Sequence, residues 1–175
     1  VRQVPFASLT TDVSEDRTRD ALADLTTGTD GPVKLVTENG TLTVNGGAAG
    51  GGVDADGSGD VLLEARGTGA DVVVNADVVS GTGHITLNAA DDVDVNDVLT
   101  TGGAGTVYVL AGDNEGTGLN GISIDATLTT VDGDVLLESA DDIGQTALIT
   151  TTNGGLVTIE IRPGEIVCLV GENGA

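Results

Sequence analysis

An acidic loop between residues 54 and 60 is the strongest candidate for metal chemistry in this sequence. It runs Asp54-Ala-Asp-Gly-Ser-Gly-Asp60, so Asp54, Asp56 and Ser58 alternate before a glycine, as in the opening of a calcium-binding loop. The bidentate acid expected at the twelfth position of such a loop would fall on an alanine, with Glu64 one residue early. We therefore expect either a calcium site with Asp54, Asp56, Ser58 and Asp60 as ligands, or a plain acidic turn. The sequence indicates no other cofactor.

Two aspartate pairs are the candidates for acid-base chemistry. Asp91-Asp92 and Asp141-Asp142 follow equivalent predicted strands, so a stacked fold would bring their carboxylates close together. Paired carboxylates serve glycosidases or bind calcium. A sugar-degrading site also needs aromatic or basic groups, and the sequence offers only Tyr108, Phe6 and His84 for that role. Because no Ser-His-Asp or Cys-His arrangement is recognisable either, we expect no catalytic residues and no enzyme activity.

The charge of the chain restricts its partners. Twenty-eight acidic residues against six basic ones give a formal net charge of -22, which repels nucleic-acid phosphates and anionic lipids. The charge suits cation binding, a salty extracellular medium or simply a well-solvated surface. No run reaches the roughly 18 apolar residues of a membrane span. Cys168 is the single cysteine, so we expect no internal disulfide, and a secreted form would have its signal peptide removed or outside this sequence.

The elements that must position these residues are strands of an internal repeat. Six segments share the pattern Gly-x-apolar-x-apolar, beginning at Gly31, Gly59, Gly83, Gly105, Gly133 and Gly155. The starts are 28, 24, 22, 28 and 22 residues apart, and glycine-rich insertions at 46–52 and 113–118 account for the longer intervals. Six starts imply five full repeats.

A second strand follows within each repeat. Copies occur at 42–45, 72–75, 93–96 and 122–125, with a degraded fifth copy at 143–146. A third short segment follows, ending in an apolar residue before a turn rich in Thr, Ser and Gly. Alternation of apolar and polar residues marks strands with one buried face. The Asn or Asp that recurs at the end of the second strand is typical of a corner, where a short side chain bonds nearby backbone.

Two or three short strands per repeat, without helices between them, predict an all-β parallel β-solenoid, or β-helix, of about five to six rungs over residues 31–161. Aromatic residues make up only 1% of the chain, so ladders of Val, Leu and Ile must fill the core. An antiparallel sandwich would explain the spacing of the strands. It would not explain why every repeat keeps the same order of motifs.

One repeat resembles a known family. Residues 83–103, Gly-His-Ile-Thr-Leu-Asn-Ala-Ala-Asp-Asp-Val-Asp-Val-Asn-Asp-Val-Leu-Thr-Thr-Gly-Gly, are similar to repeats of filamentous-haemagglutinin-like exoproteins and giant bacterial surface adhesins, and the likeness extends over about 31–160. The resemblance implies a right-handed β-helical shaft at the cell surface. Self-association into fibres, neighbouring repeats of a longer chain, and a cell-surface or glycan receptor are the partners it suggests. The alternative function is that of a carbohydrate-binding or polysaccharide-degrading β-helix protein.

The N-terminal residues 1–30 are predicted to form a cap or docking segment. Ser14 is placed to cap a short amphipathic helix that ends near Leu25. Such a helix would cover the open edge of the first rung, or it would dock a neighbouring subunit.

The C-terminal residues 162–175 form a predicted strand or tail. The segment 160–175 is similar to the Walker A region of ABC-transporter ATPases, with Gly171 as the first glycine of the phosphate loop. The sequence lacks the Lys and Ser/Thr that would bind phosphate and magnesium, so we expect no nucleotide binding. One alternative is that residues 165–170 form a strand that closes the last rung, and a fused, truncated or misassigned tail is equally consistent with the sequence.

Overall fold

The chain is an all-β parallel solenoid, as predicted. The structure, a computed structural model, describes residues 25–47, 51–112 and 121–161. These ranges contain seventeen strands and no helix. The strands form two six-stranded sheets and one five-stranded sheet, with parallel pairing throughout. No helix long and apolar enough to cross a membrane occurs in the described ranges.

Sheet B is built from the Gly-x-apolar-x-apolar segments, each of which gives a five-residue strand. Its members are β2 (Val33–Thr37), β5 (Val61–Ala65), β8 (Ile85–Ala89), β11 (Val107–Ala111), β14 (Val135–Ser139) and β17 (Val157–Ile161). Each strand pairs with the equivalent strand one turn away at the same register, so Val33 aligns with Val61 and Val61 with Ile85. The predicted first strand of every repeat is therefore confirmed.

Sheets C and A contain the shorter strands. Sheet C consists of β3 (Leu42–Asn45), β6 (Val72–Asn75), β9 (Val93–Val95), β12 (Ile122–Ile124) and β15 (Ile143–Gln145). Sheet A consists of β1 (Leu25–Thr27), β4 (Val53–Ala55), β7 (Val78–Ser80), β10 (Leu99–Thr101), β13 (Leu128–Thr130) and β16 (Ile149–Thr151). The order B, C, A repeats from β2 to β16, giving five complete turns, and β1 and β17 begin and end the series.

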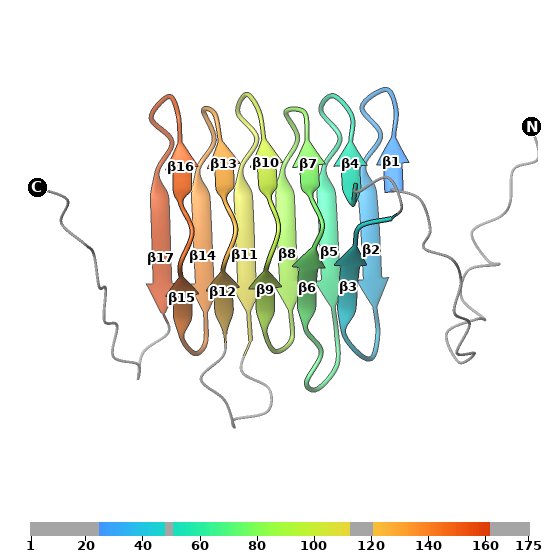
Figure 1. Cartoon of the computed structure of the whole chain (residues 1–175), viewed down its shortest axis with the longest axis vertical. Helices are drawn as coiled ribbons and strands as arrows, with labels where there is room; N and C mark the ends of the chain where they lie inside the picture. Colours follow the sequence, from blue (N-terminus) through green and yellow to red (C-terminus); the bar gives the residue numbers. More distant parts are fainter. Residues whose placement is uncertain (1–24, 48–50, 113–120, 162–175) are drawn as a thin grey trace, which may run out of the picture.

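The path of the chain is a right-handed coil, the hand that parallel crossovers almost always take. In Figure 1 the chain climbs through sheets C and A, descends through sheet B, and places each turn to the left of the one before. Neighbouring turns are one strand spacing apart, about 4.8 Å. The long axis of the coil therefore runs perpendicular to the strands.

The core is a set of aliphatic columns inside the coil. Inward residues of the middle turns, such as Leu63, Leu87, Val109 and Leu137, have no exposed surface. Each lies directly above the equivalent residue of the turn before. Burial of each Val, Leu or Ile side chain contributes about 1.5–3 kcal/mol, so a core without large aromatic side chains can still stabilise the coil.

The glycine that begins each sheet B strand is required by a close approach between turns. A Cβ built on Gly133 would lie 1.8 Å from the carbonyl oxygen of Gly105, and one on Gly105 would lie 2.3 Å from that of Gly83. The same collision recurs at Gly59, Gly83 and Gly155. Only glycine allows the backbone of one turn to lie this close to the next, which explains the first letter of the motif.

A column of buried hydroxyl groups lies beside these glycines. Thr101 Oγ1 donates to the carbonyl oxygen of Gly83 at 2.7 Å, and Ser80 Oγ donates to that of Gly59 at 2.8 Å. Both side chains are almost fully buried. The hydroxyls satisfy carbonyl groups at the corner between sheets A and B, where the chain turns too tightly for a regular ladder.

The corner after sheet C carries the predicted Asn and Asp residues, but their side chains bond one another rather than the nearby backbone. Asn75 Nδ2 donates to Asn45 Oδ1 at 3.2 Å, and Asn96 Nδ2 donates to Asn75 Oδ1 at 3.0 Å. Farther along the same column, Thr146 Oγ1 donates to Asp125 Oδ1 at 2.6 Å. This corner is an axial ladder of polar side chains, not a series of independent turns.

The solenoid begins earlier than the predicted boundary at residue 31. Leu25, placed by the sequence near the end of a helix, is the first residue of strand β1, which pairs with β4. The rest of the predicted N-terminal helix, including Ser14, lies outside the described residues. The C-terminal segment 162–175 with its Walker A similarity lies outside them as well.

Candidate functional site

A cluster of three carboxylates lies at the corner between sheets B and C. Asp71 immediately precedes β6, and Asp91 and Asp92 immediately precede β9, one turn farther along. Carboxylate oxygens of the three residues lie within 4.8 Å of one another. Asp71 is anchored on both sides, because Thr41 Oγ1 donates to its Oδ2 at 3.1 Å and the backbone N–H of Asp92 donates to its Oδ1 at 3.3 Å.

The surroundings of Asp92 in this cluster raise the pKa of its carboxyl group. Burial raises the pKa of Asp92 to about 6, and the charges of Asp91, Asp71, Asp94 and Asp141 act in the same direction. The neighbouring negative charges disfavour ionisation of Asp92. The arrangement can therefore bind a proton near neutral pH, and its spacing and oxygen ligands also suit a hard cation.

Acidic side chains on the neighbouring part of sheet C and its far corner are affected too. The pKa of Asp94 on β9 is raised, first by burial and then by the charges of Asp71 and Asp125. Burial, a hydrogen bond with Asp97 and the charge of Asp97 raise the pKa of Asp77. In contrast, hydrogen bonds from Thr146 and Ser123 lower the pKa of Asp125. The carboxyl groups of Asp77, Asp92 and Asp94, on or beside sheet C, are therefore protonated more readily than ordinary aspartates.

The four residues of the predicted calcium loop are distributed along a strand and a turn. Asp54 is the exposed middle residue of β4, and Asp56 Oδ2 accepts the backbone N–H of Thr29 at 3.1 Å. Asp60 Oδ1 accepts the backbone N–H of His84 at 2.8 Å. Two of the loop's carboxylates therefore join neighbouring turns.

Ser58 of the same loop is also part of a contact between turns. Its backbone N–H and its hydroxyl both donate to Asp30 Oδ1, at 2.7 and 3.2 Å. Within the described ranges, the carboxylates close enough to share a cation are those of Asp71, Asp91 and Asp92. Calcium binding at residues 54–60 stays a prediction.

His84 has a structural role that its position on the surface does not reveal. Its Nδ1 accepts the backbone N–H of Thr106 at 3.1 Å, and lies 2.8 Å from the Thr106 hydroxyl. In the last turn, Asp134 Oδ1 likewise accepts the backbone N–H of Leu156 at 2.7 Å. His84 thus belongs to an axial column of acceptors at the x position of the Gly-x-apolar motif.

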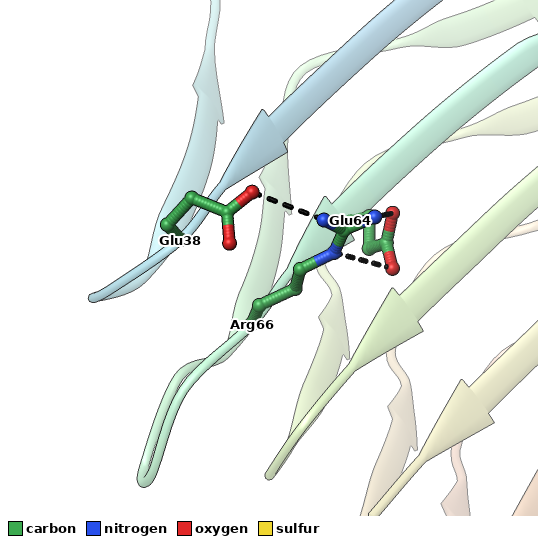
Figure 2. Close-up of polar contacts among 3 residues, drawn as sticks. All are labelled: Glu38, Glu64 and Arg66. Atoms are coloured by element: carbon green, nitrogen blue, oxygen red, sulfur yellow. Dashed lines mark hydrogen bonds and ion pairs between the residues drawn. The ribbon is translucent and has the colours of Figure 1, made fainter.

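Arg66 forms an ion-paired group at the N-terminal half of the coil (Figure 2). Its Nε and Nη2 donate to the two carboxylate oxygens of Glu64, at 2.9 and 2.8 Å, and its Nη1 donates to Glu38 Oε1 at 3.0 Å. The bidentate hydrogen bonding with Arg66 lowers the pKa of Glu64. Since Glu38 follows β2 and Arg66 follows β5, the guanidinium joins two successive turns, although exposure limits its contribution to stability.

Tyr108 is the aromatic residue of the described ranges, and it lies on the outer face of sheet B. Its hydroxyl donates to Glu138 Oε2 at 2.9 Å, one turn farther along. A shallow hollow beside the pair is lined by Thr106, Asp134 and Thr158, among others. Phe6, the other aromatic residue, lies outside the described residues.

The C-terminal end of the coil exposes apolar side chains. Leu148 and Leu156 are 66% and 65% exposed, and Val157 is 38% exposed. The inward residues Ile149 of β16 and Ile159 of β17 are only half-buried, whereas their counterparts in the middle turns are buried. The outer strands of the three sheets at this end are β15, β16 and β17.

The sequence identified part of this arrangement. The two predicted aspartate pairs lie two turns apart, with the turn that carries Gly121 between them, although the charge of Asp141 still contributes to the raised pKa of Asp92. Asp71, which belongs to no aspartate pair in the sequence, is nearer to Asp91 and Asp92. An indication was available, since Asp71 precedes the second strand of its repeat as Asp92 and Asp142 do.

Comparisons with known proteins give no relative. No family model matches the chain, and neither the curated proteins nor the solved structures contain a significant match.

Proposed function

We propose that this chain is a segment of an extracellular structural or adhesive fibre at a cell surface, which stacks or polymerises through the ends of its solenoid. We propose further that it is not an enzyme and acts by contact. Its contribution is a straight, soluble rod whose length grows by the addition of turns.

The observation that carries the proposal is the constant register of sheet B over six strands. Each residue of β2 is aligned with its equivalent in β5, β8, β11, β14 and β17. A ladder of this kind can be extended at either outer strand without a change in geometry, because every added strand meets the same pattern of N–H and C=O groups. The outer strands of the described sheet are β2 and β17.

Charge and sequence similarity support the location. A net charge of -22 keeps a rod with many apolar columns soluble, and it suits a surface in a salty medium. The similarity of residues 83–103 to surface-adhesin repeats points the same way. Adhesion to a cell-surface or glycan receptor, the finer part of the proposal, draws its support from that similarity alone.

Assembly is the measurable consequence. We expect the purified chain to form fibres of uniform width in negative-stain electron microscopy, and their mean length to increase with protein concentration. Sedimentation velocity over the same concentrations should show a growing fraction of large species. The experiment is run with excess calcium and with chelator, because the carboxylates of Asp71, Asp91 and Asp92 lie close enough to share a cation. Monodisperse small particles at the highest soluble concentration, under both conditions, would contradict the proposal.

A carbohydrate-binding or polysaccharide-degrading function is the second candidate, and the Tyr108 hollow is the observation that favours it. An aromatic face beside carboxylate acceptors is a common way to bind a sugar ring. Screening on glycan arrays and turnover assays on acidic and neutral polysaccharides test this candidate, with Tyr108→Ala as the site variant. Turnover, or binding that Tyr108→Ala abolishes, would place this function above the fibre.

A further inference from the structure

We infer that two copies of this chain join head to tail, with β17 of one copy paired in parallel with β2 of the next, so that Leu156 lies against Pro32. This inference rests on the proposed fibre function and specifies its contact. The argument depends on how the first and last turns differ from the turns between them.

The clearest difference lies in the column formed by the x residues of the Gly-x-apolar motif. Its members in axial order are Pro32, Asp60, His84, Thr106, Asp134 and Leu156. Three side chains of this column accept the backbone N–H of the next x residue. Asp60 Oδ1 accepts that of His84 at 2.8 Å, His84 Nδ1 that of Thr106 at 3.1 Å, and Asp134 Oδ1 that of Leu156 at 2.7 Å.

The two ends of the column are complementary. Pro32, the first member, has no N–H to donate. Leu156, the last member, has no side-chain acceptor to offer, and it is 65% exposed. Suppose that another turn were stacked on Leu156. Unless the x residue of that turn were proline, its backbone N–H would find no acceptor on the leucine side chain. Pro32 therefore fits above Leu156, and the contact between them is apolar on both sides.

The backbone ladder continues across the same contact. In each turn, the first residue of the sheet B strand donates its N–H to the carbonyl oxygen of the x residue in the next turn. The bond is 2.8 Å from Val33 to Asp60, and 2.8 Å from Val135 to Leu156. Val157 is the next donor in this series and Pro32 provides the first acceptor, so pairing β17 with β2 joins them without changing the pattern.

Gly31 gives independent support. At the five later positions of the glycine column, an added Cβ would lie 2.3 Å or less from the carbonyl oxygen of the glycine one turn earlier. At Gly31 the nearest atoms are Thr27 Cβ, at 3.1 Å, and the Gly28 carbonyl oxygen, at 3.3 Å, both from the segment just before β2 and not from a stacked turn. A preceding turn from a second copy would place the carbonyl of Gly155 beneath Gly31, and glycine would then be as necessary there as at the other positions.

The incompletely buried apolar side chains of the last strand agree with this pairing. In the proposed register Val157 and Ile159, which are incompletely buried, are covered by Val33 and Leu35.

Sheets A and B carry the junction. Both have six strands, so β1 follows β16 and β2 follows β17 at the normal spacing. Sheet C has five strands, so it would be one strand short at the junction. Six strands per copy, about 4.8 Å apart, give an expected axial repeat of about 29 Å along the fibre.

The test uses complementary variants of the full chain. Leu156→Asp places a carboxylate against Pro32, which has no N–H to donate to it. The unpaired carboxylate should raise the protein concentration for half-assembly by at least about 10-fold. Pro32→Thr alone should also weaken assembly, by about 5-fold or more, since it leaves one N–H without an acceptor against Leu156. The double variant should recover most of the assembly, because the new acceptor and donor reproduce the bond between Asp60 and His84.

Two controls make the result specific. Thr100→Asp adds the same charge to the outer face of β10, away from both ends, and should leave assembly unchanged. Far-UV circular dichroism and thermal unfolding of each variant confirm that the monomer is folded. Fibre diffraction of the wild type should show the repeat of about 29 Å.

The outcomes separate the junction from the fibre itself. Loss of assembly in Leu156→Asp with recovery in the double variant supports the junction. Wild-type fibres that persist in Leu156→Asp, or that the double variant fails to restore, overturn the junction and leave the fibre proposal intact. A wild-type chain that never assembles overturns both.

Discussion

His84 Nδ1 accepts the backbone N–H of Thr106 at 3.1 Å, in the same way that Asp60 Oδ1 accepts the backbone N–H of His84 one turn earlier. An imidazole and a carboxylate therefore perform the same task at equivalent positions. What this position needs is a hydrogen-bond acceptor of suitable length. The single histidine of the chain is a connector between turns.

Replacement of His84 tests this role. His84→Ala removes the acceptor for Thr106 N–H, and we expect a loss of about 0.5–1.5 kcal/mol in unfolding free energy. His84→Asp supplies a carboxylate, as at Asp60, and should retain most of the wild-type stability. Urea unfolding followed by circular dichroism distinguishes the two. Equal losses in both variants would mean that the imidazole contributes by packing instead.

The glycine column predicts a strong effect of a single methyl group. A Cβ at residue 133 would lie 1.8 Å from the carbonyl oxygen of Gly105, so Gly133→Ala must push two turns apart. We expect a loss of roughly 1–3 kcal/mol, measured as a lower urea midpoint. Gly28→Ala is the matched control, since its Cβ would have no heavy atom within 4 Å. A control that loses as much stability as Gly133→Ala would argue against the close approach.

The buried hydroxyl of Thr101 allows a nearly isosteric test. Thr101→Val keeps the shape of the side chain but leaves the carbonyl oxygen of Gly83 without its 2.7 Å donor, which should cost about 1–3 kcal/mol. Thr100, the neighbouring residue on β10, points outward, so Thr100→Val should change the stability by less than about 0.5 kcal/mol. Thermal unfolding of the pair measures the difference. Similar melting temperatures would show that the hydroxyl is dispensable.

The carboxylate corner predicts higher stability in acid. The pKa of Asp92 is raised to about 6 in the folded chain, above an unfolded value of about 3.9. The folded state therefore binds more protons between these values, so stability falls as the pH rises from about 4 to about 6 and stays lower above that range. Asp92→Asn removes the charge, and it should stabilise the chain by roughly 1 kcal/mol at pH 7, allowing for solvent screening.

The pH profile provides the check on this assignment. At pH 4 the Asp92→Asn variant and the wild type should unfold at nearly the same urea concentration, because Asp92 is then largely protonated. Asp54→Asn makes the same substitution on the exposed face of β4 and serves as the matched control. A constant gain for Asp92→Asn from pH 4 to pH 7 would exclude titration of this carboxyl as the cause.

The strands could be predicted because glycine and alternating apolar residues leave a local pattern in the sequence. All six Gly-x-apolar-x-apolar segments are strands of sheet B, and the first two copies of the second strand, Leu42–Asn45 and Val72–Asn75, have the predicted bounds. Sheet A was less apparent. Its strands have three residues each, and that of the first complete turn, Val53–Ala55, overlaps the sequence that resembles a calcium loop.

The contacts between turns were harder to predict, because they depend on which residues are stacked. Asp71 and Asp92 lie 21 residues apart, whereas other equivalent pairs lie 30 apart, as Asn45 and Asn75 do. The variable loops shift the interval, so no fixed spacing identifies the partners. Asp56 and Asp60 show a further reason. The local sequence around an aspartate that accepts a backbone N–H from another turn can be the same as that around a calcium ligand.

The unvarying register of sheet B also has a consequence for how such a molecule can change over generations. Removal or duplication of one whole turn leaves every remaining column aligned, since each residue simply meets the equivalent member of the next turn. Insertion or removal of part of a turn would instead move each glycine out of the corner between sheets A and B. A residue with a side chain would then occupy that corner, where there is no room for it. The gene can therefore lengthen or shorten the rod in whole-turn steps, and its reach can be adjusted without redesign of its core.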